Sequence, residues 1–124
     1  MYYISVRAEF DAAHWLPKYK GKCKQLHGHH WVVEGRWARE DVEASGISLD
    51  LSKLKRALRK VCGEYDHTCL NDFSNLRTPS AENIAAAIYA MMTAMYGGSS
   101  LFYIKVEETP GCSVTYCLSG GKQT

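Results

Sequence analysis

Four of the five histidines occupy positions 14, 27, 29 and 30, within the first quarter of the chain. His27 and His29 are two residues apart, so on an extended backbone both imidazoles project to the same side. His14 lies on the other arm of an expected hairpin and can supply a third ring. Three imidazoles favour zinc over magnesium or calcium, which prefer oxygen ligands. The spacing therefore predicts a zinc site at His14, His27 and His29, with separately packed or solvated rings as the alternative.

Two neighbours of these histidines require separate interpretation. His30 points to the opposite face of the same strand, so we expect it to be structural or exposed. Cys23 lies four residues before His27 between two lysines, a setting that favours the thiolate. As a fourth ligand, Cys23 would close a tetrahedral structural zinc site. As a base or nucleophile, it would act beside a metal with an open fourth position, and the spacing leaves both roles possible.

Two acidic positions add candidate chemistry further along the chain. In Asp66-His67, the carboxylate can orient the imidazole as in an acid–base relay, although neighbours on a strand point apart. A solvated helix end is the alternative for this pair. Glu108 shares its side of a predicted strand with three apolar residues, Phe102, Ile104 and Val106. A carboxylate there either accepts from the N–H groups of a ligand or marks the exposed end of the strand.

Hydrophobic periodicity predicts the elements that position these residues. Alternating apolar residues predict strands over residues 3–10, 29–38, 101–108 and 113–118. Helical spacing predicts helices over residues 51–65 and 80–96, the second with Ser80 as its N-cap, and we expect disorder over residues 119–124. The order ββααββ predicts one α+β domain over residues 1–124, a four-stranded antiparallel sheet with two helices on one face. The long connection over residues 11–28 is the expected location of a functional site.

Composition narrows the class of protein. The 124 residues are 46% hydrophobic and carry a formal net charge of +2, so no global basic field indicates a nucleic-acid binder. The longest apolar run has nine residues, and a membrane-spanning helix needs about 20, so we expect a soluble, cytoplasmic protein with reduced cysteines. Cys62, Cys69, Cys112 and Cys117 are expected to be small buried hydrophobes. The uncovered face of the sheet predicts oligomerisation, with Trp31, Trp37 and Tyr116 as candidates for burial there.

Four segments in fixed order form a pattern along nearly the whole chain. They are FDAAH at residues 10–14, CKQLHGH at 23–29, DHTCLN at 66–71 and ET at 108–109. Together they resemble the 6-pyruvoyl tetrahydropterin synthase and 6-carboxytetrahydropterin synthase family, as do residues 49–51 and 79–83. Members usually have Thr where this chain has Ser80, Phe where it has Leu51 and Leu where it has Tyr65. Ser80 retains the hydroxyl, so none of these differences disables the chemistry.

The resemblance implies a fold, an assembly and a set of roles. The fold is the tunnelling fold (T-fold), whose subunits form trimers that pair into homohexamers with interfacial active sites. The implied zinc ligands are His14, His27 and His29, with Cys23 as catalytic base. Asp66 and His67 of a neighbouring subunit would complete the proton relay. Glu108 would anchor the pterin, and Ser80 is a further candidate substrate contact.

The resemblance also implies a lyase that acts on 7,8-dihydroneopterin triphosphate. The short chain favours the microbial enzymes that release acetaldehyde and triphosphate and form 6-carboxytetrahydropterin for queuosine biosynthesis. A 6-pyruvoyltetrahydropterin synthase of the tetrahydrobiopterin branch is the first alternative. A non-catalytic protein whose structural zinc is closed by one cysteine and three histidines is the second. Four lysines, Lys18, Lys20, Lys22 and Lys24, are candidates for steering or binding the triphosphate.

Overall fold

The computed structural model describes the chain except Tyr19, residues 97–99 and residues 119–124, and the side chains of Cys23 and Tyr96 also lie outside the described part. Residues 119–124, for which we expect disorder, therefore lie outside the described part of the chain. The main elements, in chain order, are β1 (Tyr2–His14), β2 (His27–Arg39), α1 (Leu51–Tyr65), β3 (Thr68–Cys69), α2 (Ala81–Tyr96), β4 (Leu101–Thr109) and β5 (Cys112–Tyr116). Short 3-10 turns occupy Lys22–Lys24, Leu70–Asp72 and Ser74–Leu76. No described helix is long and apolar enough to cross a bilayer.

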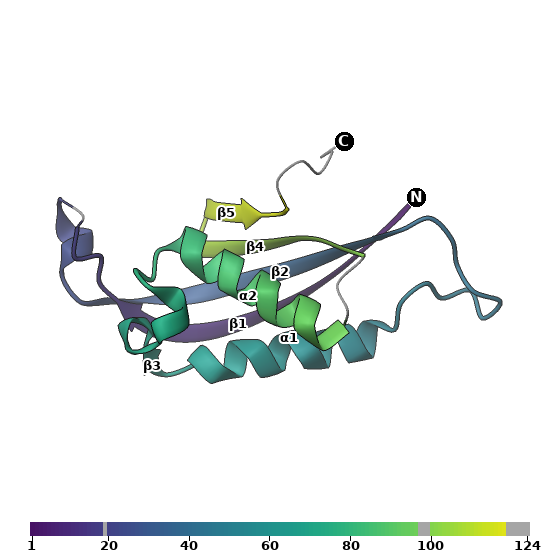
Figure 1. Ribbon diagram of the computed structural model, residues 1–124, viewed down its shortest axis with the longest axis horizontal. Helices are drawn as coiled ribbons and strands as arrows, with labels where there is room; N and C mark the ends of the chain where they lie inside the picture. The colour runs from purple at the N-terminus through teal and green to yellow at the C-terminus, as the bar shows by residue number, and fades with distance from the viewer. Residues whose placement is uncertain (19, 97–99, 119–124) are drawn as a thin grey trace.

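The strands form one mixed sheet in the order β3-β1-β2-β4-β5 (Figure 1). The α+β class with two helices is as predicted, but the four-stranded antiparallel sheet and the order ββααββ are wrong. β3 is a fifth strand between the helices, and it pairs parallel to β1 at Ala12 and Ala13. Two residues are too short to show the period-2 pattern that identifies a strand.

The first hairpin is longer than its apolar alternation predicts. β1 and β2 pair antiparallel from Tyr2 opposite Arg39 to His14 opposite His27. The connection between them therefore covers residues 15–26 rather than 11–28. The core-facing series continues beyond Phe10 with Ala12 and His14, which are short or polar and carry no apolar signal, although both are buried. Because of this extension, His14 and His27 form the last pair of the β1–β2 ladder.

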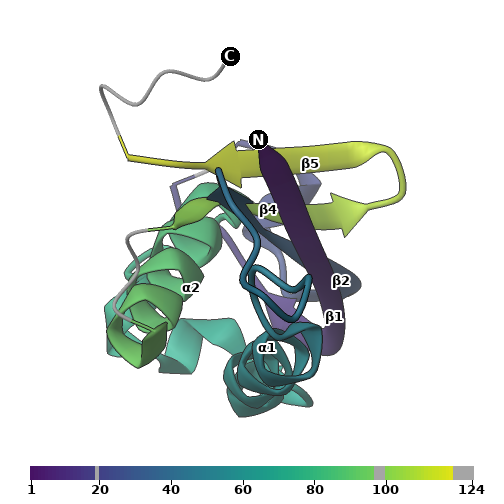
Figure 2. The same ribbon diagram turned by 90° about the vertical axis from the view of Figure 1, so that its right-hand side faces the viewer.

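Both helices cover the same face of the sheet, as the end-on view in Figure 2 shows. β2 contributes Trp31, Val33 and Trp37 to that face, where they are at most 3% exposed. The expectation that Trp31 and Trp37 lie on the uncovered face is therefore wrong, because their inward series places them under the helices. Tyr116 is half-buried beside Tyr89 of α2, with ring centroids 5.2 Å apart, so it too packs on the face that the helices cover.

Local signals at the helix starts match the structure. Asp50 caps α1 by accepting hydrogen bonds from the amides of Ser52 and Lys53 at 2.9 and 3.4 Å. Ser80 Oγ accepts from the amide of Asn83 at 3.2 Å, so Ser80 is the N-cap of α2 as predicted. Ser80 therefore has a structural role whether or not it also contacts a ligand.

A bulge changes the phase of β4. The β2–β4 register shifts between Arg36 and Trp37, so Trp37 lies opposite Leu101. Leu101 is consequently buried, whereas Phe102 is only half-buried. The alternation in the sequence predicts that Phe102 shares the core-facing side with Ile104. The bulge makes that prediction wrong for Phe102.

Substitution of Gly35 by alanine is expected to destabilise the protein. A Cβ at Gly35 would lie 2.9 and 3.0 Å from ring atoms of Trp37 and 3.4 Å from Ile104. Overpacking of this kind costs about 1–3 kcal/mol in the free energy of unfolding, which urea denaturation measures. The control is Gly63→Ala in α1, where a Cβ meets nothing within 4 Å and a gain of about 0.5–1 kcal/mol is expected. Equal stability of Gly35→Ala and the wild type would refute this packing.

Candidate metal centre

Three histidines meet at one end of the first hairpin. His14 is the last residue of β1, and His27 lies directly opposite it at the start of β2. His29 is two residues further along β2, on the same face. One ring nitrogen from each histidine lies within 4.8 Å of those from the other two, so the group is able to hold a metal ion. The structure thus brings together the three residues that the spacing had singled out.

Hydrogen bonds to main-chain carbonyls fix the tautomers of two of the rings. His14 Nδ1 lies 2.7 Å from the carbonyl oxygen of Pro79, and His27 Nδ1 lies 2.6 Å from that of Gln25. A carbonyl oxygen only accepts, so each Nδ1 carries a proton, and in the neutral ring each Nε2 presents a lone pair. The two Nε2 atoms face each other at 3.1 Å. Two acceptors at this distance repel unless a cation lies between them, so the donor set fits a metal ion.

Burial favours the neutral, metal-coordinating form of His14 and His29. The pKa of His14 is lowered chiefly by desolvation, and a nearby His27 adds to this effect, while the Pro79 carbonyl and Glu108 oppose it. The pKa of His29 is lowered for the same main reason, partly offset by Glu108. Metal ions compete with protons for such nitrogens. Both rings therefore remain available as ligands at neutral pH.

The lowered pKa values predict a pH-dependent stability of the metal-free protein. The unfolded chain binds protons at His14 and His29 near their ordinary pKa of 6.5, whereas the folded chain binds them only at lower pH. The contribution of these two rings to the free energy of unfolding is therefore fully present above pH 6.5 and decreases as the pH falls below it. We expect the Tm of the metal-free protein to decrease from pH 7.5 to pH 5.5 and to decrease less in His29→Gln. A Tm independent of pH over this range would contradict the burial of these rings.

Glu108 reaches the histidines from β4. Its Oε1 lies 3.5 Å from His14 Nε2 and 3.9 Å from His29 Nε2, and its side chain is 30% exposed. Glu108 and Ser80 line the same cavity of about 260 Å³, together with Leu16, Ala81, Glu82 and residues 112–114. The two side chains predicted to contact substrate thus lie on one cavity that borders the histidine cluster.

The Asp66-His67 pair forms a hydrogen-bonded unit of its own. His67 has a φ of 59°, a left-handed conformation that turns its ring back toward the preceding residue. Asp66 Oδ2 lies 2.8 Å from His67 Nδ1, while Asp66 Oδ1 accepts from the amide of Asp11 at 2.9 Å. The Asp11 amide, followed by the His67 ring, lowers the pKa of Asp66. Two neighbours that would point apart on a strand are therefore able to act together.

His67 does not join the three histidines within one chain. Its side chain is 81% exposed, and its hydrogen bonds in the described part of the chain reach only Asp66 and Asp11. The relay pair and the histidine cluster thus present separate surfaces on a single subunit.

The cysteines differ in their surroundings. Cys23 belongs to the turn Lys22–Lys24, but its side chain lies outside the described residues, so its role stays a prediction. Cys62 is buried, which raises the pKa of its thiol to about 12 and agrees with the prediction of a small buried hydrophobe. That prediction is wrong for Cys112, which is exposed at the β4–β5 hairpin, and overstated for Cys69 and Cys117, which are half-buried.

The groups that bond the histidine rings and the neighbouring Trp15 could not be predicted from the sequence. The carbonyls of Pro79 and Gln25 are main-chain atoms and carry no signal of residue type. Asn71 bonds both main-chain groups of Trp15 across a separation of 56 residues. Its position in the DHTCLN segment marked Asn71 as part of a pattern, but nothing in the pattern indicated this contact.

Comparison with known proteins places this geometry in a family. The sequence profile of the 6-pyruvoyl tetrahydropterin synthase family matches residues 3–118. The chain belongs to this family. As a member of the 6-pyruvoyl tetrahydropterin synthase family it is an enzyme, a lyase of the class that eliminates triphosphate, and the predicted resemblance is confirmed.

Relatives in this family carry two different names. The 6-carboxy-5,6,7,8-tetrahydropterin synthase of Synechocystis sp. is 35% identical over 122 residues, which cover 94% of this chain and 93% of that protein. The protein of the same name in Bacillus subtilis is 30% identical, covering 87% of this chain and 77% of its own length. The structure of Caenorhabditis elegans 6-pyruvoyl tetrahydropterin synthase is 29% identical and superimposes with a TM-score of 0.83, covering 95% and 96% of the two chains.

Proposed function

We propose that this protein is a zinc-dependent 6-carboxy-5,6,7,8-tetrahydropterin synthase. It would convert 7,8-dihydroneopterin triphosphate to 6-carboxytetrahydropterin, acetaldehyde and triphosphate, in the biosynthesis of queuosine. The observation that carries the proposal is the pair of facing Nε2 atoms of His14 and His27 beside the cavity that Glu108 lines. Relatives named for this activity in Synechocystis sp. and Bacillus subtilis favour it over the pyruvoyl-forming alternative.

The cavity and the histidine cluster support distinct roles for the side chains. When bound by the three histidines, zinc would polarise the hydroxyl groups of the substrate side chain and favour their deprotonation. Glu108 would accept hydrogen bonds from pterin N–H groups, and Ser80 would provide a hydroxyl at the same cavity. Glu108 Oε1 lies 3.5 Å from His14 Nε2, and Ser80 shares its cavity, so the two residues would orient one small molecule toward the histidines.

Proton transfer is assigned to Cys23 and the Asp66-His67 pair. Cys23, as the thiolate, would remove a proton from the substrate side chain. Asp66 would hold the proton of His67 on Nδ1 and stabilise the imidazolium, which leaves Nε2 free to accept or donate. Because His67 faces solvent on its own subunit, we assign the relay to the active site of a neighbouring subunit.

A homo-oligomer with interfacial active sites follows from this assignment, and we propose a hexamer built from two trimers. β5 forms one edge of the sheet. At the other edge β1 pairs with β3 at Ala12 and Ala13, and no other described strand pairs with that side of β1. Open edges are suited to pairing with further strands.

The four cysteines whose side chains are described are free, which fits the reducing cytoplasm that we propose as the location of this protein.

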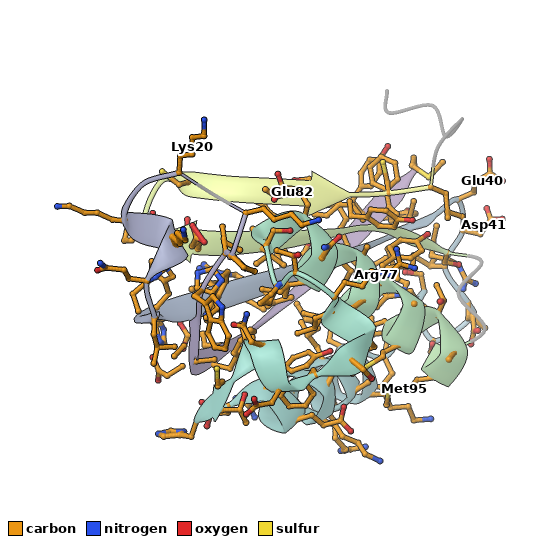
Figure 3. All side chains as sticks on the ribbon, turned by 60° about the vertical axis from the view of Figure 1, so that its left-hand side comes forward. Lys20, Glu40, Asp41, Arg77, Glu82 and Met95 are labelled. Carbon is orange, nitrogen blue, oxygen red and sulfur yellow. The ribbon has the colours of Figure 1, made fainter. Side chains whose placement is uncertain are left out.

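The lysine-rich segment before Cys23 is a candidate contact for the triphosphate. Lys20 extends away from the body of the protein in the connection between β1 and β2 (Figure 3). Triple replacement of Lys18, Lys20 and Lys22 by Gln is expected to raise KM several-fold with little change in kcat, because steering of an anionic substrate acts on encounter. Steady-state kinetics at low and high salt measure this effect. A KM equal to that of the wild type would remove the segment from the site.

The proposed function is tested by the products. Zinc-loaded protein is incubated anaerobically with 7,8-dihydroneopterin triphosphate, and the products are identified by mass spectrometry together with an acetaldehyde assay. A carboxypterin with acetaldehyde is the expected result. A pyruvoyl product without acetaldehyde would transfer the protein to the tetrahydrobiopterin branch. Absence of turnover would refute the proposal and favour the closed structural zinc site.

A further inference from the structure

Asn71 extends the β1–β3 ladder by one step with its side chain. The parallel pairing ends at Ala13 opposite Cys69, and Asn71 follows two residues later in a 3-10 turn. Asn71 Oδ1 accepts from the amide of Trp15 at 3.0 Å, and Asn71 Nδ2 donates to the carbonyl of Trp15 at 3.0 Å. The primary amide thereby supplies the donor and the acceptor that a neighbouring strand would otherwise provide.

The same segment is attached to β1 at its other end. Asp66 Oδ1 accepts from the amide of Asp11, and the amide of His67 donates to the Asp11 carbonyl at 2.6 Å. Residues 66–71 are therefore bonded to the main chain of β1 at residue 11 and along the β3 pairing at residues 12 and 13, and to the main chain of Trp15 just beyond the end of β1. His14 lies directly between the last two of these attachments.

The hairpin itself does not hold the chain beyond His14. The β1–β2 register ends at the pair His14 and His27, and strand ends fray when the next residue has no partner. Both described hydrogen bonds of the Trp15 main chain are made by Asn71. Fraying at this point would separate two candidate metal ligands whose Nε2 atoms are 3.1 Å apart.

We propose that Asn71 is a positioning residue of the metal centre. By holding both main-chain groups of Trp15, it keeps His14 opposite His27 and preserves the bond from His14 Nδ1 to the Pro79 carbonyl. The hydrogen bonds described for the Asn71 side chain reach Trp15 and Cys69 rather than the histidine rings, so Asn71 acts through the backbone. This inference rests on the metal centre of the proposed function, but it concerns metal affinity and is independent of the identity of the substrate.

The test compares Asn71→Ala and Asn71→Asp with the control Asn75→Ala. Asn75 is a neighbouring asparagine whose side-chain amide donates to the Tyr65 hydroxyl at 3.3 Å, and none of its hydrogen bonds within the described residues reaches the three histidines. The Kd for Co²⁺ is measured by competition with a chelator, together with the visible spectrum of the cobalt-loaded protein. Asn71→Ala is expected to bind Co²⁺ about 10–100-fold more weakly than the wild type. Asn71→Asp keeps only the acceptor for the Trp15 amide, so its Co²⁺ affinity should lie between those of the wild type and Asn71→Ala.

Kinetics separate positioning from a general loss of stability. In the zinc-loaded Asn71→Ala enzyme, kcat should fall while KM stays near the wild-type value, and Asn75→Ala should change neither. Equal Co²⁺ affinity in Asn71→Ala and Asn75→Ala would overturn the inference. If Asn71→Ala fails to fold, wild-type affinity in Asn71→Asp would overturn it in the same way. A wild type that binds Co²⁺ but does not convert the pterin would refute the proposed function and leave this inference intact.

Discussion

Replacement of Cys23 by alanine is expected to give a folded, zinc-loaded protein with almost no activity. A positioned general base contributes about 10²–10⁴-fold to the rate, so kcat/KM should fall by that factor. Zinc should remain because His14, His27 and His29 form a complete set of three ligands without a sulfur. The measurements are steady-state kinetics, zinc content per subunit and the Tm.

A second cysteine provides the control for this prediction. Cys117 is a free, half-buried thiol near the end of β5, and Cys117→Ala should retain both zinc and activity. Loss of zinc together with unfolding in Cys23→Ala would contradict the prediction. That outcome would identify Cys23 as the fourth ligand of a closed structural site.

Replacement of His27 by alanine is expected to remove the metal and the activity together. His27 begins β2 and is only half-buried, so its loss should disturb the fold less than loss of the fully buried His14. Loss of one of three protein ligands should weaken zinc binding by at least about 100-fold, since changes to groups outside the ligand set already cost 10–100-fold. Zinc content after dialysis and kcat with added zinc measure both effects.

His30 is the matched control for His27. It lies on the opposite face of β2, where Asp11 at 2.8 Å, followed by Glu9 at 3.4 Å, raises the pKa of its ring. His30→Ala should therefore retain zinc, because this ring belongs to a surface ion pair. Full zinc content and activity in His27→Ala would contradict the assignment of the ligands.

The sequence predicted the histidine cluster because strand periodicity is a strong constraint. Two residues separated by one always share a face of a strand, so His27 and His29 had to project together. The opposing position of His14 depended on the register of the hairpin, which a uniform antiparallel pairing settles. The long strands and both helices had clear periods and were predicted on the same grounds.

Contacts between distant segments carried no comparable signal. β3 is two residues long, and its parallel pairing with β1 depends on how the chain returns after α1. The inward orientation of Trp31 and Trp37 could be read from their alternation, but the prediction assigned them to the uncovered face. The closeness of Asp66 and His67 required a positive φ, which residue type does not reveal.

The proposed active site is a metal ion held by three histidines, with an open position for substrate. X-ray absorption at the zinc edge of the loaded wild-type protein tests it most directly. We expect nitrogen or oxygen neighbours at about 2.0–2.1 Å, no sulfur, and a spectrum that is unchanged in Cys23→Ala. A sulfur neighbour at about 2.3 Å that disappears in Cys23→Ala would show a closed site and refute the open metal position.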